Sequence, residues 1–268
     1  MGRAYHEIWL AERPGGAASW GAMQPRFVIA DGLERVLEPE VMDTPDEARD
    51  YDAMDHATVN AWFCDDFLLF ASQEGHPAIG AKSARVIDFG TGTALIPIAL
   101  CGRAAGFTVV AIDLAENMLA LAHRNVARAK LGDRVLLEKV DAKGTPYEDG
   151  AFGATISNSI VHHIPEPQRC LTEMWRVTAK GGLLFVRDLH RPATTSEVDR
   201  IVALHAGTAP EDPSLVASFE NQRSLFRASL CAALTIAEVV AMVAPLGIPA
   251  SAVTMTSDRH WTLACEKP

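Results

Sequence analysis

Three aspartates stand where apolar runs of the sequence end, and their side chains could bind one ligand together. Asp88 lies near the end of the first run, Asp113 closes the second and Asp141 directly follows the third. If these runs are parallel strands, their carboxyl ends share one sheet edge, where carboxylates accept hydrogen bonds from ribose hydroxyls or an adenine amino group. A single aspartate at a strand exit is often only a helix cap or turn residue. Three in succession favour a nucleotide-type site.

A glycine turn, Gly90-Thr91-Gly92, follows the first run. Glycines there tolerate positive φ and let a ligand approach the backbone, and the next helix offers free N–H groups. A dinucleotide fold would place a third glycine where Leu95 stands, and its pyrophosphate would lie beside Asp88. A carboxylate suits a cationic ligand instead, and S-adenosylmethionine (SAM) carries both a sulfonium and an ammonium. The site therefore favours SAM over NAD.

Short apolar runs alternate with helical stretches through the middle of the chain. Repeated strand–helix units predict an α/β fold with a parallel sheet covered by helices on both faces. The last two runs are joined by a short polar turn and predict a terminal β-hairpin. The predicted strands are residues 85–89, 108–113, 135–140, 154–157 and 183–187, and the hairpin pairs residues 252–256 with 261–265.

The segments around this sheet have their own signals. Residues 1–43 have no sustained period and are expected to form an irregular N-terminal arm, before a domain that spans residues 44–268. A capping box predicts a helix over residues 44–71, and a second one, at residues 235–238, opens another helix. Residues 192–250 are expected to be a helical insertion or lid within the domain.

Five stretches in this order resemble class I SAM-dependent methyltransferases, particularly those of quinone biosynthesis. The resemblance covers about half of the chain. It implies a Rossmann-like, seven-stranded, mostly parallel sheet with an antiparallel last strand. The matching stretches are residues 86–93 (VIDFGTGT), 111–119 (AIDLAENML), 140–142 (VDA), 157–165 (SNSIVHHIP) and 173–182 (EMWRVTAKGG).

The resemblance also implies which residues bind the cofactor. The first aspartate and the glycine turn hold the methionine part, the second aspartate holds the ribose, and a tyrosine of a preceding helix covers the cofactor. Asn158 follows the fourth strand and is expected to hold the cofactor by its carbonyl, with binding of an acceptor amine as the alternative. The predicted cofactor residues are Tyr51, Asp88, Gly90, Thr91, Gly92, Asp113, Asn158 and, around the adenine, Leu114, Met118, Asp141 and Ala142.

Polar residues in the segments directly after the later strands are expected to face the methyl acceptor. His162, His163 and Asp188 are the candidates for a general base, which is needed only if the acceptor carries a proton. The two histidines could instead cap a helix or pack in the core. The arginines among the acceptor candidates could instead form surface salt bridges, which is the more common role of exposed arginines. A metal held by the two histidines with Asp188 and His190 has no diagnostic spacing, so no metal is expected. The predicted acceptor-binding residues are Ser159, His190, Arg191, Arg259 and His260.

Composition narrows the choice of partners. The 268 residues carry a formal net charge of −10, which disfavours a nucleic-acid backbone as partner. No run approaches the about 20 apolar residues of a membrane-spanning helix, and the start lacks the apolar core of a secretory signal. Five scattered cysteines indicate reduced thiols and a cytoplasmic protein. Nothing in the sequence indicates the oligomeric state.

These observations together predict an enzyme that transfers a methyl group from SAM to a small-molecule acceptor and releases S-adenosylhomocysteine (SAH). Two alternatives from other classes remain at this point. One is a module that senses SAM or SAH without chemistry, and the other is an NAD-dependent oxidoreductase.

Overall fold

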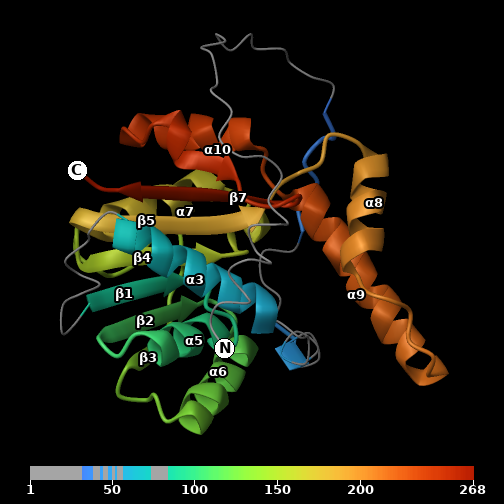
Figure 1. Cartoon of the computed structure of the whole chain (residues 1–268), viewed down its shortest axis with the longest axis horizontal. Helices are drawn as coiled ribbons and strands as arrows, with labels where there is room; N and C mark the ends of the chain where they lie inside the picture. Colours follow the sequence, from blue (N-terminus) through green and yellow to red (C-terminus); the bar gives the residue numbers. More distant parts are fainter. Residues whose placement is uncertain (1–31, 39–42, 45–47, 50–51, 53–56, 74–83) are drawn as a thin grey trace. The chain divides into compact units, whose positions relative to one another are not determined.

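The central element is a seven-stranded sheet with the strand order β3-β2-β1-β4-β5-β7-β6 (Figure 1). A computed structural model describes residues 32–38, 43–44, 48–49, 52, 57–73 and 84–268. All of these belong to one unit, Gly32–Pro268. The strands are β1 (Ala84–Phe89), β2 (Phe107–Asp113), β3 (Val135–Lys139), β4 (Phe152–Asn158), β5 (Thr178–Leu189), β6 (Val253–Met255) and β7 (His260–Glu266).

The strand directions confirm the predicted sheet. Strands β1 to β5 pair in parallel, whereas β7 runs antiparallel to both β5 and β6. The chain order reverses between β1 and β4, which lie side by side although two strand–helix units separate them in sequence. In open parallel sheets, ligands bind beyond the carboxyl ends of the strands at such a switch point.

Helices cover both faces of the sheet because its central strands are apolar on both sides. On one face, α3 (Ala57–Gln73), α5 (Leu95–Arg103) and α6 (Glu116–Ala129) pack in one buried cluster. On the other, α7 (Pro167–Val177) and α10 (Ile236–Val243) pack in a second cluster. The capping box predicted for α10 is present, with Thr235 and Glu238 bonded reciprocally.

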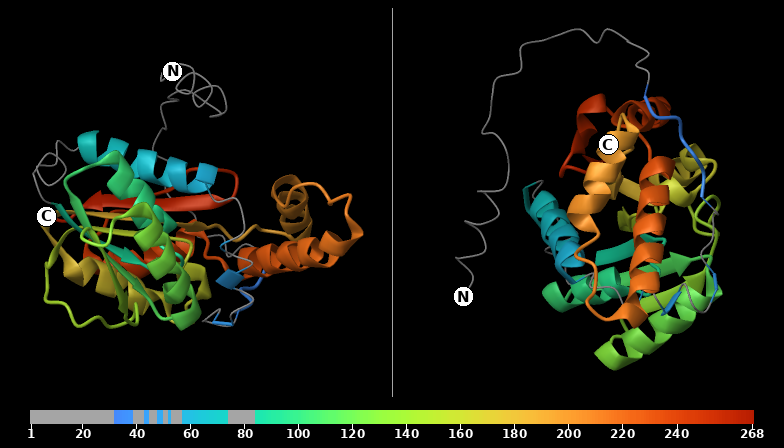
Figure 2. Two further views of the ribbon diagram at one scale, coloured as in Figure 1. Left: turned by 90° about the horizontal axis from the view of Figure 1, so that it is seen from below. Right: turned by 90° about the vertical axis from the view of Figure 1, so that its right-hand side faces the viewer.

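Two further helices form a hairpin between β5 and α10. They are α8 (Thr195–His205) and α9 (Pro213–Ala232), and they lie side by side away from the sheet (Figure 2). Val198 and Ile201 of α8 and Leu230 of α9 bury a small core of their own. Part of the predicted insertion is therefore a separate helical hairpin, whereas α10 belongs to the covering of the sheet.

The described part of the predicted N-terminal arm is an extended segment, residues 32–38, called here the strap. Its backbone donates hydrogen bonds from Leu33 to the Ala193 carbonyl and from Val36 to the Cys231 carbonyl, both at 3.1 Å. The strap is thereby fixed to the helical hairpin. Of the helix predicted over residues 44–71, the described portion includes α3 from Ala57 onward, while its capping box lies outside the described residues.

None of the helices in the described ranges combines the length and apolarity required to cross a bilayer.

Candidate functional site

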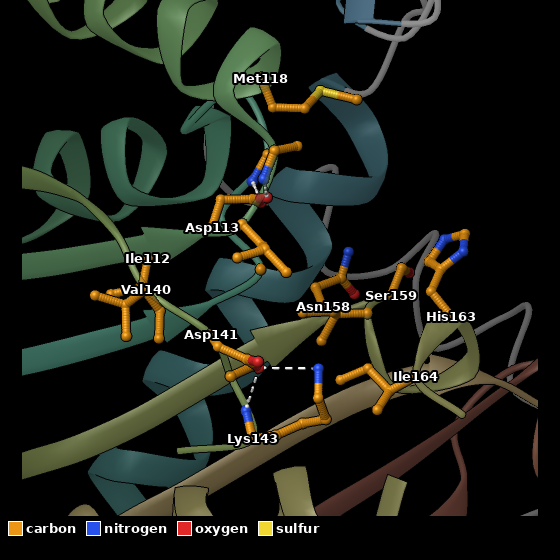
Figure 3. Close-up of a pocket in the computed structure, with 16 residues that line it drawn as sticks. Ile112, Asp113, Met118, Val140, Asp141, Lys143, Asn158, Ser159, His163 and Ile164 are labelled. Atoms are coloured by element: carbon orange, nitrogen blue, oxygen red, sulfur yellow. Dashed lines mark hydrogen bonds and ion pairs between the residues drawn. The ribbon is translucent and has the colours of Figure 1, made fainter. Parts of the chain in front are cut away.

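A pocket opens at the carboxyl ends of β1 to β4, where the switch point lies (Figure 3). Its empty volume is about 830 Å3, open solvent at the mouth included. Most of the predicted cofactor residues line it. They are Gly90, Gly92, Asp113, Leu114, Met118, Asp141, Ala142 and Asn158.

The turn after β1 needs glycine for two separate reasons. Gly90 and Gly92 have φ values of +70° and +56°, which side chains rarely adopt. A Cβ atom on Gly90 would also lie 2.4 Å from Cδ1 of Ile160. The backbone N–H groups of Gly90 and Thr91 both donate to the Ile112 carbonyl at 2.9 Å, so the turn is tied to β2. It presents bare backbone to the pocket.

Asp113 joins the turn to the end of β2. One carboxylate oxygen accepts the N–H of Gly92 at 2.7 Å, and the other accepts the N–H of Ala115 at 2.9 Å. Burial raises the pKa of this carboxyl despite these hydrogen bonds. Each carboxylate oxygen has a second lone pair, so the side chain can still accept bonds from two ribose hydroxyls.

A carboxylate oxygen and an amide oxygen beside the turn, and the hydroxyls of Thr91 and Thr93 within it, are buried without a hydrogen-bond partner among the described residues. The first two are Oδ2 of Asp88, whose residue is 2% exposed, and Oδ1 of Asn158. Burial raises the pKa of Asp88 to about 7. Unpaired buried acceptors are costly, so both fit a bound donor, and a carboxylate fits a cationic one best. The residues present therefore suit the ammonium-bearing methionine part of SAM.

The far end of the pocket combines an apolar wall with one ion pair. Met118 of α6 lies at this end, and Asp141 accepts the backbone N–H of Lys143 at 2.8 Å and pairs with its ammonium at 2.9 Å. Although burial alone would raise it, the contacts with Lys143 lower the pKa of Asp141. Lys143 itself lines the pocket and was not among the predicted residues.

The opposite end of the pocket is formed by the chain that leaves β4. Ser159, Ile160, His163 and Ile164 line it. Ser159 has a φ of +61°, which is strained for a residue with a side chain and is held by its N–H bond to the Arg187 carbonyl at 2.9 Å. Of the predicted acceptor-binding residues, Ser159 lies at this end.

The other two catalytic candidates lie behind the pocket wall. Asp188 is fully buried within β5, and its carboxylate accepts the N–H groups of Val161 at 2.6 Å and His162 at 3.2 Å as well as a bond from the His162 ring. His162 is 3% exposed. The attraction of the His162 ring lowers the pKa of Asp188 although burial alone would raise it. The pair holds the short 3-10 helix Val161–His163 against the sheet.

The remaining acceptor candidates do not line the pocket. Arg191 donates to the Ala233 carbonyl and to the carboxylate of Glu238, both at 2.7 Å. Arg259 contacts His205 and Asp258. His190 and His260 lie beside these arginines, and burial lowers the pKa of both imidazoles, that of His260 to about 3.

Three predicted cofactor residues do not line the pocket, and two unpredicted residues lie near it. Asp88 and Thr91 are buried without lining the pocket, and Tyr51 lies outside the described residues. Asp43 accepts the N–H of Asn117 at 2.8 Å, at the start of α6. Glu38 of the strap lies 3.1 Å from Nδ1 of His163. Neither acidic residue carries a local sequence signal, because both act on segments far along the chain.

Comparison with known proteins gives one family match. Residues 87–186 match the family described as "Methyltransferase domain". The demethylmenaquinone methyltransferase of Thermus thermophilus is 36% identical over 115 residues, which is 43% of this chain and 51% of that protein. The phosphatidylethanolamine N-methyltransferase of Cereibacter sphaeroides is 34% identical over 108 residues, 40% of this chain and 52% of that protein. The chain thus spans about half the length of these curated relatives.

Solved structures share the fold at low sequence identity. A SAM-dependent methyltransferase from Aquifex aeolicus matches with a TM-score of 0.55 and 18% identity, over 82% of this chain and 97% of that one. The plantazolicin methyltransferase, solved with SAH, matches with a TM-score of 0.58 and 15% identity, over 78% and 71%. The chain therefore shares the fold of SAM-dependent methyltransferases, and residues 87–186 match the methyltransferase-domain family, as the motifs predicted.

Proposed function

We propose that this protein transfers a methyl group from SAM to a small-molecule acceptor and releases SAH. The observation that carries the proposal is the pocket at the switch point, where the glycine turn meets the ribose-type acceptor Asp113 and the strand that leads into the turn holds the buried, unpaired Oδ2 of Asp88. This combination suits a cationic nucleoside better than a pyrophosphate.

The residues of the chain divide along the pocket into a cofactor end and an acceptor end. Asp88 and Asn158 receive the ammonium part, Asp113 the ribose, and Met118 with Asp141 surrounds the adenine. When bound, SAM supplies a methyl group on a sulfonium, a good leaving group, so alignment and exclusion of water matter most. The apolar side chains of Ile112 and Ile160, which line the pocket, serve this purpose.

At the acceptor end, His163 is the catalytic candidate that lines the pocket, within the part of the chain that the structure describes. We assign it to contact with the acceptor. Asp188 acts through the His162 ring and the backbone of the 3-10 helix, so both are positioning residues. His190, Arg191, Arg259 and His260 support the surrounding fold rather than the acceptor.

A small acceptor is supported by two observations. The named relatives act on demethylmenaquinone and phosphatidylethanolamine, and the net charge of −10 disfavours a polyanion. We also place the protein in the reducing cytoplasm, because Cys64, Cys101, Cys170, Cys231 and Cys265 are all free thiols.

Calorimetric titration with SAM, SAH and NAD tests the cofactor assignment. We expect one SAM or SAH per chain and no NAD. Binding of NAD without SAM would replace the proposal by an oxidoreductase. Binding of SAM without methyl transfer to any acceptor would instead favour a sensor.

A further inference from the structure

Three side chains that can bind metals converge behind the acceptor end of the pocket. Glu38 comes from the strap, and His162 and His163 come from the 3-10 helix after β4. One potential ligand atom from each lies within 4.8 Å of the others. The two imidazole rings are 4.0 Å apart at their centroids. Segments more than 120 residues apart in sequence thus supply one cluster.

Glu38 and His163 form a close pair without a well-formed hydrogen bond. Oε2 of Glu38 lies 3.1 Å from Nδ1 of His163, and this buried nitrogen meets no hydrogen-bond geometry within the described part of the chain. Two potential ligand atoms at this separation can share one ion. Tetrahedral sites with metal–ligand bonds of about 2.0–2.2 Å place neighbouring ligand atoms at about this distance.

His162 is oriented as metal-binding histidines usually are. Its Nδ1 bonds to the carboxylate of Asp188, so Nε2 is the nitrogen left for coordination. A carboxylate behind a histidine fixes the ring and raises its basicity, and this arrangement recurs around protein metal ions. Asp188 is itself fully buried and held by three backbone N–H groups, those of Val161, His162 and Leu189.

Glu38, the remaining residue of the cluster, is also held in place. Ser229 of α9 donates a hydrogen bond to Glu38 at 3.0 Å. Arg35 directs its guanidinium to the carbonyls of His162, Ile164 and Ala232 at 2.7 to 3.1 Å, which fixes the strap on the 3-10 helix. When both imidazoles are neutral, the carboxylates of Glu38 and Asp188 outweigh the single charge of Arg35. The cluster can then take up one further positive charge, which is either a proton or a metal ion.

We propose that Glu38, His162 and His163 bind one divalent transition-metal ion, with Zn2+ as the best match. Two imidazoles and one carboxylate suit Zn2+, Co2+, Ni2+ or Fe2+, whereas Mg2+ and Ca2+ prefer oxygen ligands. This revises the expectation from sequence, which was that no metal is bound. The set of ligands considered and rejected there contained Asp188 and His190 in place of Glu38.

The position of the ion suggests what it does. His163 lines the pocket, whereas Glu38 and His162 do not, so the ion lies behind the acceptor end and reaches it through His163. The ion would fix the orientation of the His163 ring that faces the acceptor. This role rests on the proposed function, whereas binding of the metal does not.

The test is metal binding by the full chain without cofactor. Protein freed of metal with a chelator is titrated with ZnCl2, and with CoCl2 while its visible absorption is followed. We expect one ion per chain and a cobalt spectrum typical of four-coordinate nitrogen and oxygen ligands. E38Q, which keeps the shape of the side chain, should weaken zinc binding by at least about tenfold.

Matched controls separate this result from general effects. E34Q changes an exposed glutamate of the same strap, and H123N changes an exposed histidine of α6, and both should bind zinc as the unchanged protein does. Circular dichroism verifies the fold of each variant. Failure of the unchanged protein to bind zinc or cobalt, or equal binding by E38Q, overturns the proposal. SAM titration of the same samples shows independently whether the cofactor assignment stands.

Discussion

The carboxylate of Asp113 at the end of β2 accepts the backbone N–H of Gly92 in the turn after β1, at 2.7 Å. One side chain thereby both shapes the glycine turn and faces the pocket. The two motifs that the sequence suggested separately are one hydrogen-bonded unit.

Replacing Asp113 with alanine should weaken SAM binding by about 1–3 kcal/mol, or about 5- to 150-fold in Kd, because buried ribose hydroxyls lose their acceptor. Calorimetry measures the effect. D133A, which removes an exposed aspartate before β3, is the control and should leave the affinity unchanged. Equal affinities for the two variants would remove Asp113 from the site.

Replacing Gly90 with alanine should lower the free energy of unfolding by about 1–3 kcal/mol and impair SAM binding, since both its positive φ and the side chain of Ile160 oppose a Cβ atom. Thermal unfolding and calorimetry measure the two effects. In the helix α5, Gly102 has open space around it, and G102A should be neutral or slightly stabilising. A G90A protein that is as stable as G102A would contradict the described turn.

SAM affinity should rise with pH up to about 7, because the cofactor requires the ionised form of Asp88, whose pKa burial raises to about 7. Below that pH, binding must release a proton, and the affinity falls by up to about tenfold per pH unit. The stability of the free protein changes with pH in the opposite direction. Between pH 4 and 7 the unfolded carboxyl ionises while the folded one stays neutral, so stability falls as pH rises through this window.

Titrations between pH 5.5 and 7.5 in buffers of different ionisation enthalpy detect the released proton. D88N should bind SAM more weakly and lose the pH dependence. Retention of the same dependence by D88N would assign it to another group.

Replacing Arg191 with methionine should lower the free energy of unfolding by about 1–3 kcal/mol, because the Ala233 carbonyl and Glu238 lose a buried donor. Affinity for SAM per folded molecule should not change. R169M, which removes an exposed pair with Glu166, should cost less than about 1 kcal/mol. A stable R191M protein with a raised KM for the acceptor would restore Arg191 to the acceptor site.

The central sheet and the cofactor end could be predicted because their signals are local. Runs that are apolar on both faces identify buried parallel strands, and Asp113 and Asn158 lie directly at strand exits. Local signals also gave a wrong position for Asp188, which was predicted to lie just after a strand. The predicted fifth strand stopped at Arg187, whereas β5 continues to Leu189, so Asp188 lies inside the sheet and bonds to the 3-10 helix.

Contacts between distant segments could not be predicted from one sequence. Glu38 pairs with His163 although 125 residues separate them in sequence. Arg191 pairs with Glu238, which follows it in the chain only after the helices α8 and α9. No composition or spacing marks such partners, because each looks like an ordinary surface charge until the strap and the helical hairpin are in place.

The most direct test of the proposed function is transfer of a labelled methyl group from SAM into an extract of source cells, which is then separated into metabolites, lipids, proteins and nucleic acids. We expect label in a small-molecule fraction, with SAH formed in equal amount, and much less label when D113A replaces the unchanged protein at a SAM concentration below its weakened Kd. Label in protein or nucleic acid would contradict the proposed acceptor class, and SAM binding without transfer into any fraction would contradict the proposed methyltransferase activity.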